Sequence, residues 1–336
     1  EVKKILVTSN TLSSSKVLGK LNFRKVIHQF FPIDTNFHSQ KFLNYWKPSS
    51  AFFIDSEIWP NMFLNLKRKK IPINLINARI TKKSFKRWKV FSNFSKKIFN
   101  TLNLCLSSSK RSKKYLLKLG AHNVKFFGNL KFAQSENEKI TPNYNLKKFI
   151  SSKKVWCASS THNTEEKFCG IIHKNLKKKY KNLLTIIIPR HIERINEIKD
   201  EMLNLNLKVH IHESKKKIES DTDIYIVNTY GKTKTFYNLC KNVFLGGSLI
   251  KHGGQNPLEA ARYGCNILHG PNIENFSEIY AFLEKNRMSQ KTGSQKKMTR
   301  ALYKLLKGRA KSKKIQLKLR LIGQQILYST LKELKI

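Results

Sequence analysis

Short apolar runs alternate with helix-length polar segments along this chain, and that alternation constrains its fold more than any other feature. The runs are rich in Ile, Val and Phe and are bounded by Asn, Ser, Gly or Pro, which is typical of buried strands. Amphipathic segments such as Thr164–Lys179 and His191–Leu203 lie between many of them. This order predicts an α/β protein with parallel sheets and helices on both sheet faces. The predicted strands are Ile5–Thr8, Val26–Phe31, Ala51–Ile54, Ile73–Ile76, Leu102–Leu106, Val124–Phe127, Val155–Ala158, Leu183–Ile188, Leu207–Ile211, Ile224–Val227, Val243–Leu245 and Ile267–Leu268.

The alternating series occurs twice, which predicts two doubly wound domains in a chain of 336 residues. We assign residues 1–133 to an N-terminal domain and residues 151–295 to a C-terminal domain. Residues 134–150 are the predicted linker, because Gln134–Asn145 is polar, contains a proline and lacks an apolar period. In residues 296–336, Leu and Ile recur at helical spacing among many Lys residues, which predicts one or two basic helices.

Net charge is the most unusual value in the composition, because 66 Lys and Arg residues stand against 21 Asp and Glu residues and give +45. Three explanations remain open at this point. They are phosphate binding on a nucleic acid, attraction to an anionic membrane or substrate, and a compositional bias toward Lys on solvated faces. The Lys residues are spread over the whole length, and the sequence contains no zinc finger, helix-turn-helix or aromatic-interleaved basic motif. Charge alone therefore does not decide the function.

Membrane segments and cysteines give weaker indications. No run approaches the roughly 18 apolar residues of a membrane helix, and no signal-peptide pattern is present. The five cysteines form no CxxC pair, and Cys105 and Cys157 lie in apolar runs, so we expect buried, reduced thiols. The chain begins at Glu1 rather than Met, in what reads as a strand already under way, so we expect a further N-terminal segment before it.

A glycine-rich stretch, GGSLIKHGGQNPLEAARYG at 246–264, follows the predicted strand Val243–Leu245. Ligands of open α/β sheets bind at the carboxyl ends of strands. Asn256 suits the N-cap of the following helix, Pro257 its first position and Glu259 a capping box. The same helix start, with free N–H groups, suits an anion. The stretch by itself does not separate capping from ligand binding.

Two other polar clusters follow predicted strands. In IIIPRHIER at 186–194, Arg190 stands where a guanidinium can bind a phosphate bidentately, and a salt bridge to Glu193 or Glu197 is the alternative. In FFIDSEIWP at 52–60, two carboxylates precede Trp-Pro. They suit acid–base chemistry or simply the first turn of a helix.

Taken in order, these stretches resemble the bacterial Kdo transferases, which add 3-deoxy-D-manno-octulosonic acid (Kdo) to a lipid A precursor. The resemblance covers nearly the whole chain, with the motifs in the family's order. The matching stretches are DSEIWPN at 55–61, INARITKKSF at 76–85, GNLKF at 128–132, WCASSTHNTEE at 156–166, IIIPRHIER at 186–194, FLGGSLIKHGGQNPLEAARYG at 244–264 and HGPNIENFSEI at 269–279.

The resemblance implies a GT-B glycosyltransferase, an α/β fold with two Rossmann-like domains that face a central cleft. The N-terminal domain would meet the lipid acceptor, and the C-terminal domain would bind the donor CMP-Kdo. It implies an inverting transfer to a lipid A precursor (lipid IVA) in lipopolysaccharide synthesis, with no metal or other cofactor, at the cytoplasmic face of the inner membrane. The expected partners are the lipid and an anionic membrane surface, not a nucleic acid. The alternatives are a GT-B enzyme for another nucleotide sugar and a basic nucleic-acid-binding protein.

The family's functional residues carry over onto matching positions of this sequence. Two of them match positions that stabilise the transition state, and nine match positions that contact CMP. In the loop 231–233, Lys232 stands where the family normally has an acidic residue. The transition-state residues are Glu57 and Lys131. The CMP contacts are Pro189, Arg190, Gly231, Lys232, Thr233, Asn256, Pro257, Leu258 and Glu259.

The chemistry expected of such a site agrees with these residue types. The phosphate of CMP gains charge as the sugar leaves, and a helix N-terminus, an Arg and a Lys stabilise that charge without a metal. A carboxylate base takes the proton of the acceptor hydroxyl. In the family this base is a Glu in a glycine-rich loop near the N-terminus, and no such stretch occurs here. The first match, Ile5–Thr11, lies downstream of it in relatives, so we expect a fragment rather than a divergent form.

Overall fold

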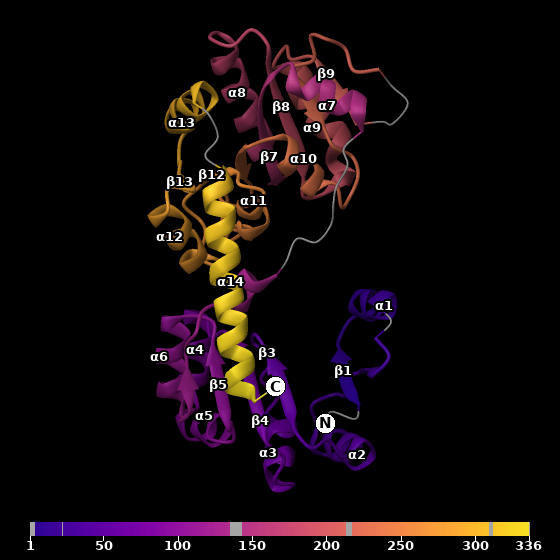
Figure 1. Ribbon diagram of the computed structural model, residues 1–336, viewed down its shortest axis with the longest axis vertical. Helices are drawn as coiled ribbons and strands as arrows, with labels where there is room; N and C mark the ends of the chain where they lie inside the picture. The colour runs from indigo at the N-terminus through magenta and orange to yellow at the C-terminus, as the bar shows by residue number, and fades with distance from the viewer. Residues whose placement is uncertain (1–3, 22, 135–142, 213–216, 309–311, 336) are drawn as a thin grey trace. The chain divides into compact units, whose positions relative to one another are not determined.

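The computed structural model describes residues 4–21, 23–134, 143–212, 217–308 and 312–335 (Figure 1). Most of the predicted linker, residues 135–142, therefore lies outside the described residues, as do the first three residues. The chain divides into two compact units. Unit 1 comprises Glu1–Leu130 and Tyr328–Ile336, and unit 2 comprises Lys131–Leu327. The domain boundaries derived from the sequence remain predictions.

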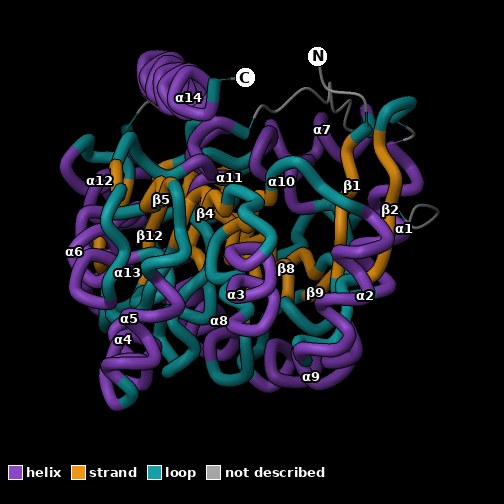
Figure 2. The backbone as a smooth tube through the Cα atoms, turned by 90° about the horizontal axis from the view of Figure 1, so that it is seen from below, coloured by secondary structure: helices purple, strands orange, loops and turns teal. Residues whose placement is uncertain are grey.

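Unit 1 contains a four-stranded parallel sheet in the order β3-β4-β5-β6 and a separate parallel pair, β1-β2, which run side by side in Figure 2. Its strands are β1 (Ile5–Ser9), β2 (Val26–Phe30), β3 (Ala51–Ile54), β4 (Ile73–Ala78), β5 (Leu104–Ser107) and β6 (Val124–Lys125). Its helices are α1 (Leu12–Leu21), α2 (Asn36–Trp46), α3 (Pro60–Arg68), α4 (Lys82–Val90), α5 (Ser92–Phe99) and α6 (Lys110–Leu119).

Unit 2 is built on a seven-stranded parallel sheet in the order β13-β12-β11-β7-β8-β10-β9. Its strands are β7 (Lys154–Thr161), β8 (Leu183–Pro189), β9 (Val209–Ile211), β10 (Ile224–Ile226), β11 (Asn242–Leu245), β12 (Asn266–His269) and β13 (Ser289–Lys291). Its helices are α7 (Tyr144–Ser151), α8 (Glu165–Lys177), α9 (Ile195–Asn204), α10 (Thr233–Leu239), α11 (Leu258–Arg262), α12 (Ser277–Lys285) and α13 (Gln295–Lys307). Helix α14 (Ser312–Leu334) contributes residues to both units.

The sheet of unit 2 is buried on both faces, which explains its uninterrupted apolar strands. In β8, Ile186 and Ile188 belong to one hydrophobic cluster and Ile187 to another. Val243 and Phe244 of β11 divide between the same two clusters. Side chains alternate across a strand, so each cluster covers one face of the sheet.

The direction of the sheet order changes at β7, and this change positions the site. The chain leaves β7 for β8 on one side, and β11 lies on the other side of β7. Such a switch point leaves a crevice beside the carboxyl ends of the central strands, where ligands of open α/β sheets bind. The relevant loops are therefore those that follow β7, β8 and β11.

Each strand predicted from the sequence overlaps an observed one. The predicted helix Thr164–Lys179 is observed as α8, and the predicted basic tail contains α13 and α14. The polar strand β13, with the sequence SQK, was not predicted. All five cysteines are free and buried, as expected. None of the described helices combines the length and apolar character needed to cross a membrane.

Candidate functional site

Three of the family-like segments meet at the carboxyl end of the unit 1 sheet, and Asn77 joins them. Its side-chain Nδ2 donates to Asp55 Oδ1 at 2.5 Å, and its Oδ1 accepts from the backbone N–H of Leu130 at 3.0 Å. The backbone N–H of Arg79 donates to the Asp55 carbonyl at 2.9 Å. Asp55 and Asn77 both have positive φ angles, 59° and 52°, a conformation that Asp and Asn tolerate better than most residues. The segments at 55–61, 76–85 and 128–132 thus form one local structure.

Glu57 is exposed on the loop between β3 and α3, and its carboxylate accepts from Trp59 Nε1 at 2.7 Å. It is not used to cap α3. Asp34 does that instead, because its two carboxylate oxygens accept from the backbone N–H groups of Asn61 and Met62 at 3.1 and 2.9 Å. The interpretation of Glu57 as a simple first-turn residue is therefore wrong, since α3 begins at Pro60.

Lys131, the second predicted catalytic residue, lies in a 3₁₀ turn at Leu130–Ala133. Its backbone carbonyl accepts a hydrogen bond from the Arg262 guanidinium at the end of α11. Lys131 belongs to unit 2 and Glu57 to unit 1. Their joint action on the transition state stays a prediction.

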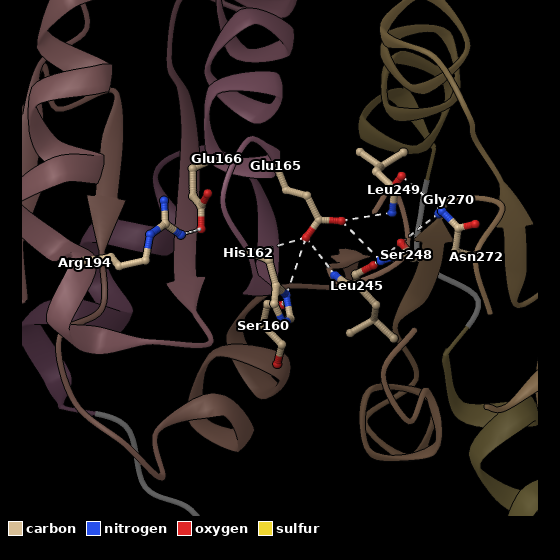
Figure 3. A network of polar contacts seen from close by, with 11 residues as sticks. Ser160, His162, Glu165, Glu166, Arg194, Leu245, Ser248, Leu249, Gly270 and Asn272 are labelled. Atoms are coloured by element: carbon tan, nitrogen blue, oxygen red, sulfur yellow. Dashed lines mark hydrogen bonds and ion pairs between the residues drawn. The ribbon is translucent and has the colours of Figure 1, made fainter. Parts of the chain in front are cut away.

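In unit 2, a buried carboxylate occupies the first part of the glycine-rich loop. Glu165, at the start of α8 and 0% exposed, accepts four backbone N–H groups (Figure 3). Its Oε2 accepts from His162 at 3.0 Å and Gly247 at 2.7 Å, and its Oε1 accepts from Ser248 at 3.2 Å and Leu249 at 3.0 Å. The N–H groups at 247–249 therefore bind the protein's own carboxylate rather than presenting an open anion site.

The rest of this loop is fixed by the family-like segment at 269–279. Ser248 Oγ accepts from the backbone N–H of Gly270 at 2.8 Å and donates to the Leu245 carbonyl at 2.5 Å. Asn272 Nδ2 donates to the Leu249 carbonyl at 3.1 Å. A Cβ on Gly246 would lie 2.4 Å from the Ser160 carbonyl oxygen, so only glycine lets β11 approach β7 this closely. Contacts with Glu165, with the segment at 269–279 and with the end of β7 therefore fix the backbone of this loop.

Arg190 follows β8 directly, and its backbone N–H donates to the Thr161 carbonyl of β7 at 2.9 Å. Pro189 before it is buried, whereas Arg190 is exposed and makes no ion pair with any residue the structure describes. The alternative of a salt bridge to Glu197 is wrong, because Arg194 takes that carboxylate at 3.0 Å. Arg190 is therefore available to an anionic ligand.

Three histidines surround this point, one from the loop after each central strand. The rings of His162 and His252 have centroids 4.6 Å apart, and those of His162 and His191 are 5.8 Å apart. Burial lowers the pKa of His162, and the charges of His252, His191 and Arg190 lower it further against the opposing Ser160 carbonyl. Sequence reasoning did not single out these histidines, because they come from segments far apart in the chain.

The predicted helix start at Asn256 is observed with a small displacement. Asn256 Oδ1 accepts from the backbone N–H of Leu258 at 3.1 Å, but the N-cap residue is Pro257, so the predicted N-cap position of Asn256 is wrong by one residue. Helix α11 begins at Leu258, and Pro257 stands just before it in a helical conformation. Glu259 is half-buried in the first turn. Burial raises the pKa of the Tyr237 phenol, and the negative charge of Glu259 raises it further.

The loop at 231–233 lies at the carboxyl end of β10, separated from β7 by β8 in the sheet. Gly231 has a φ of 79°, and Thr233 begins α10. Lys232 is exposed, and its charge adds to burial in lowering the pKa of His212. The structure thus places the CMP-contact candidates at the carboxyl end of the sheet, in the three loops that follow β8, β10 and β11.

Comparison with known proteins agrees with this assembly of segments. Residues 1–134 match the family described as 3-deoxy-D-manno-octulosonic-acid transferase (kdotransferase). The 3-deoxy-D-manno-octulosonic acid transferase of Rickettsia bellii is 35% identical over 280 residues, which cover 82% of this chain and 66% of that protein. The chain belongs to the Kdo transferase family.

Other Kdo transferases match over similar lengths. The probable mitochondrial enzyme of Arabidopsis thaliana is 30% identical over 300 residues, covering 84% of this chain and 65% of that protein. The chain covers 59% of the Rickettsia conorii protein. This chain therefore spans about two thirds or less of the length of the curated relatives it matches.

Solved structures show which fold the chain adopts. The UDP-GlcNAc 2-epimerase of Neisseria meningitidis is 15% identical, with a TM-score of 0.64 over 99% of this chain and 92% of that one. The trehalose 6-phosphate synthase of Burkholderia multivorans is 10% identical, with a TM-score of 0.56 over 89% of this chain and 74% of that one. The predicted α/β fold of the GT-B type, with two Rossmann-like units, is confirmed.

Proposed function

We propose that this chain provides the donor site and part of the acceptor site of a Kdo transferase. The reaction moves Kdo from CMP-Kdo to a lipid A precursor, lipid IVA, with inversion at the sugar carbon and CMP as the leaving group. It uses no metal or other cofactor and takes place at the cytoplasmic face of the inner membrane.

The observation that carries the proposal is the meeting of four family-like segments at the switch point of unit 2. Loops after β7, β8 and β11 converge there, and the segment after β12 fixes the glycine-rich loop. Beside them, Arg190 has no described ion-pair partner, so its guanidinium can bind the CMP phosphate. Asn256, whose Oδ1 accepts from the backbone N–H of Leu258, stands in the same glycine-rich loop just before α11. Pro189, Gly231, Lys232, Thr233 and Asn256–Glu259 complete the proposed CMP contacts.

Charge balance explains why these groups suit this leaving group. The donor sugar carbon loses electron density while the CMP phosphate gains a full negative charge on departure. Arg190 and Lys131 supply cationic donors that stabilise that developing charge. Glu57, held by the Trp59 indole, is the proposed carboxylate partner of the electron-poor sugar.

The surface of unit 1 supports a lipid acceptor and an anionic membrane as partners. Val90 and Phe91, at the corner between α4 and α5, are 75% and 68% exposed. The sequence between Glu57 and Glu136 contains no acidic residue, and Lys86, Arg87 and Lys89 flank the corner. Exposed apolar side chains among cations are the composition that binds the interface of anionic bilayers.

The test is transfer of Kdo from CMP-Kdo to lipid IVA, followed by mass spectrometry, with and without a chelator. The resemblance places the general base in a stretch that this sequence does not contain, so the assay compares this chain with a version that carries such a stretch. We expect transfer by the version with the stretch in the chelator, and CMP binding by both. Absence of transfer together with unchanged CMP affinity in Arg190→Ala contradicts the proposal. Arg320→Ala, an exposed arginine of α14, is the matched control.

Competition between CMP and UDP for binding to this protein distinguishes the proposed donor CMP-Kdo from another nucleotide sugar. Stronger binding of UDP would replace the Kdo assignment with a different GT-B donor. Salt-sensitive binding to duplex DNA without CMP binding would favour a nucleic-acid function instead.

A further inference from the structure

The paired rings of His162 and His252 are not used by the chemistry above, and their geometry gives them a further role. Both lie at the switch point of unit 2, on the loops after β7 and β11. A Cβ on Gly247 would lie 3.0 Å from His252 Cδ2 and 3.1 Å from His162 Cε1. The two rings therefore close over a position that only glycine fits, 4.6 Å apart between centroids.

The hydrogen bonds of His162 fix which ring nitrogen carries the proton. Its Nδ1 lies 3.1 Å from the Ser160 carbonyl oxygen. Because a carbonyl only accepts, Nδ1 must be the protonated nitrogen. In the neutral ring, Nε2 then presents a lone pair, and this atom is buried without a hydrogen-bond partner. His162 as a whole is only 8% exposed, so the unpartnered nitrogen is an unusual feature that calls for a ligand.

A lone pair repels an oxyanion, whereas a protonated Nε2 donates to one. The groups that face the ring from the neighbouring elements oppose protonation when no anion is bound. These are His252, His191 and Arg190, while Glu165, 3.7 Å from Nδ1, already accepts two backbone N–H groups through the same oxygen. A bound anion favours protonation instead, because its negative charge stabilises the positively charged form of the imidazole, in which both ring nitrogens carry a proton. His252 is exposed, and its ring lies 4.6 Å from that of His162 between centroids, so the pair borders solvent on the His252 side.

We propose that His162 and His252 form a proton-linked subsite for an oxyanion of the sugar donor, an inference that rests on the donor function proposed above. The shared chemistry is a singly charged oxygen acid. It is either the phosphodiester that joins cytidine to the sugar or the carboxylate of the sugar acid. Binding moves one proton from the buffer acid to an imidazole nitrogen of the pair, which forms an N–H bond there, and no bond of the sugar donor is made or broken.

Isothermal titration in buffers of different ionisation enthalpy measures this proton uptake directly. One probe is cytidine 5′-(methyl phosphate), a diester without a carboxylate, and the other is free Kdo, a carboxylate without a phosphate. Neither acid titrates between pH 6 and 8, so any uptake belongs to the protein. We expect uptake approaching one proton for the probe that occupies the subsite. Its affinity should rise by up to about tenfold per pH unit as the pH falls from 8 to 6.

The variants His252→Gln and His162→Gln keep polar groups but cannot titrate in this range. We expect proton uptake to be lost in His162→Gln, with pH dependence reduced to less than about twofold. In His252→Gln uptake should be reduced, because this variant keeps His162 Nε2 but removes the other imidazole of the pair. His252 is exposed, so its variant tests the proposal even if the buried His162 variant fails to fold. The control is His122→Gln, an exposed histidine of unit 1, which should retain wild-type uptake.

The outcomes separate this inference from the proposed function. Absence of proton uptake with every probe that binds, or unchanged uptake in His252→Gln, overturns the inference and, where CMP still binds, leaves the donor function standing. A wild-type protein that binds neither probe and no CMP overturns both.

Discussion

Replacing Glu165 by glutamine removes the carboxylate that organises the glycine-rich loop while keeping the side-chain shape. Each of its two oxygens accepts two backbone N–H groups. A glutamine has one carbonyl oxygen and an NH₂ group that cannot accept. Whichever way the amide turns, two of the four N–H donors lose their acceptor and face another donor.

The expected cost follows from those two lost acceptors. A hydrogen bond to a charged group contributes about 1.5–3 kcal/mol, and a buried donor left unpaired costs a similar amount. Two such losses lower the free energy of unfolding by about 3–6 kcal/mol. A whole domain is stable by only about 5–15 kcal/mol, so this single substitution removes a large share of the stability of unit 2.

Urea denaturation measures the loss, and hydrogen exchange of the peptide containing residues 247–249 locates it. The matched control is Glu166→Gln at the next position, which is equally buried. Glu166 pairs with Arg194 at 3.1 Å, a glutamine oxygen can still accept from that guanidinium, and Arg194 keeps Glu197. We expect a loss of only about 1–2 kcal/mol there. Equal shifts in the two variants, or unchanged protection at 247–249 in Glu165→Gln, would refute the reasoning.

Three further predictions use stability, pH and membrane binding. Gly246→Ala should destabilise unit 2 by at least about 2 kcal/mol in urea, because its Cβ would lie 2.4 Å from the Ser160 carbonyl; an unchanged midpoint contradicts the close approach of the two strands. Burial acts to raise the pKa of Asp223, but bonds from neighbours including Lys177 outweigh it and hold that pKa well below its usual range. The stabilisation by the Asp223 carboxylate is thus present above about pH 4 and lost as pH falls further. The difference in free energy of unfolding between wild type and Asp223→Asn should therefore narrow below pH 4. A difference that stays constant argues against the pairing. Phe91→Asp should weaken co-sedimentation with anionic vesicles severalfold without changing CMP binding, and equal sedimentation would exclude the α4–α5 corner from the membrane contact.

The strands of this protein could be predicted closely because parallel strands buried on both faces need uninterrupted apolar residues. The run Leu183–Ile188 is one example, and its residues divide between the clusters on the two faces of the sheet. The strand β13 was not predicted because it is not buried on both faces. It lies at the sheet edge, and Gln290 and Lys291 are exposed, so it has no apolar pattern to detect.

The candidate site was only partly predictable. Arg190 and Asn256 could be identified, because each stands at a recognisable place, the end of a strand or the start of a helix. Glu165 could not, because two acidic residues at a helix start are common and nothing local shows that four N–H groups from two loops converge on one of them. The histidine pair has no sequence pattern either, since His162 and His252 lie 90 positions apart in the numbering.

The sequence by itself determined the element types, the repeated α/β order and the family, because periodicity, caps and motif order are local properties of the chain. The tertiary structure alone decided what the glycine-rich loop faces. Its first N–H groups bind the carboxylate of Glu165, and its exposed His252 stands beside His162. The physical reason is the switch in strand order at β7, which brings loops from distant segments together at the carboxyl ends of the central strands.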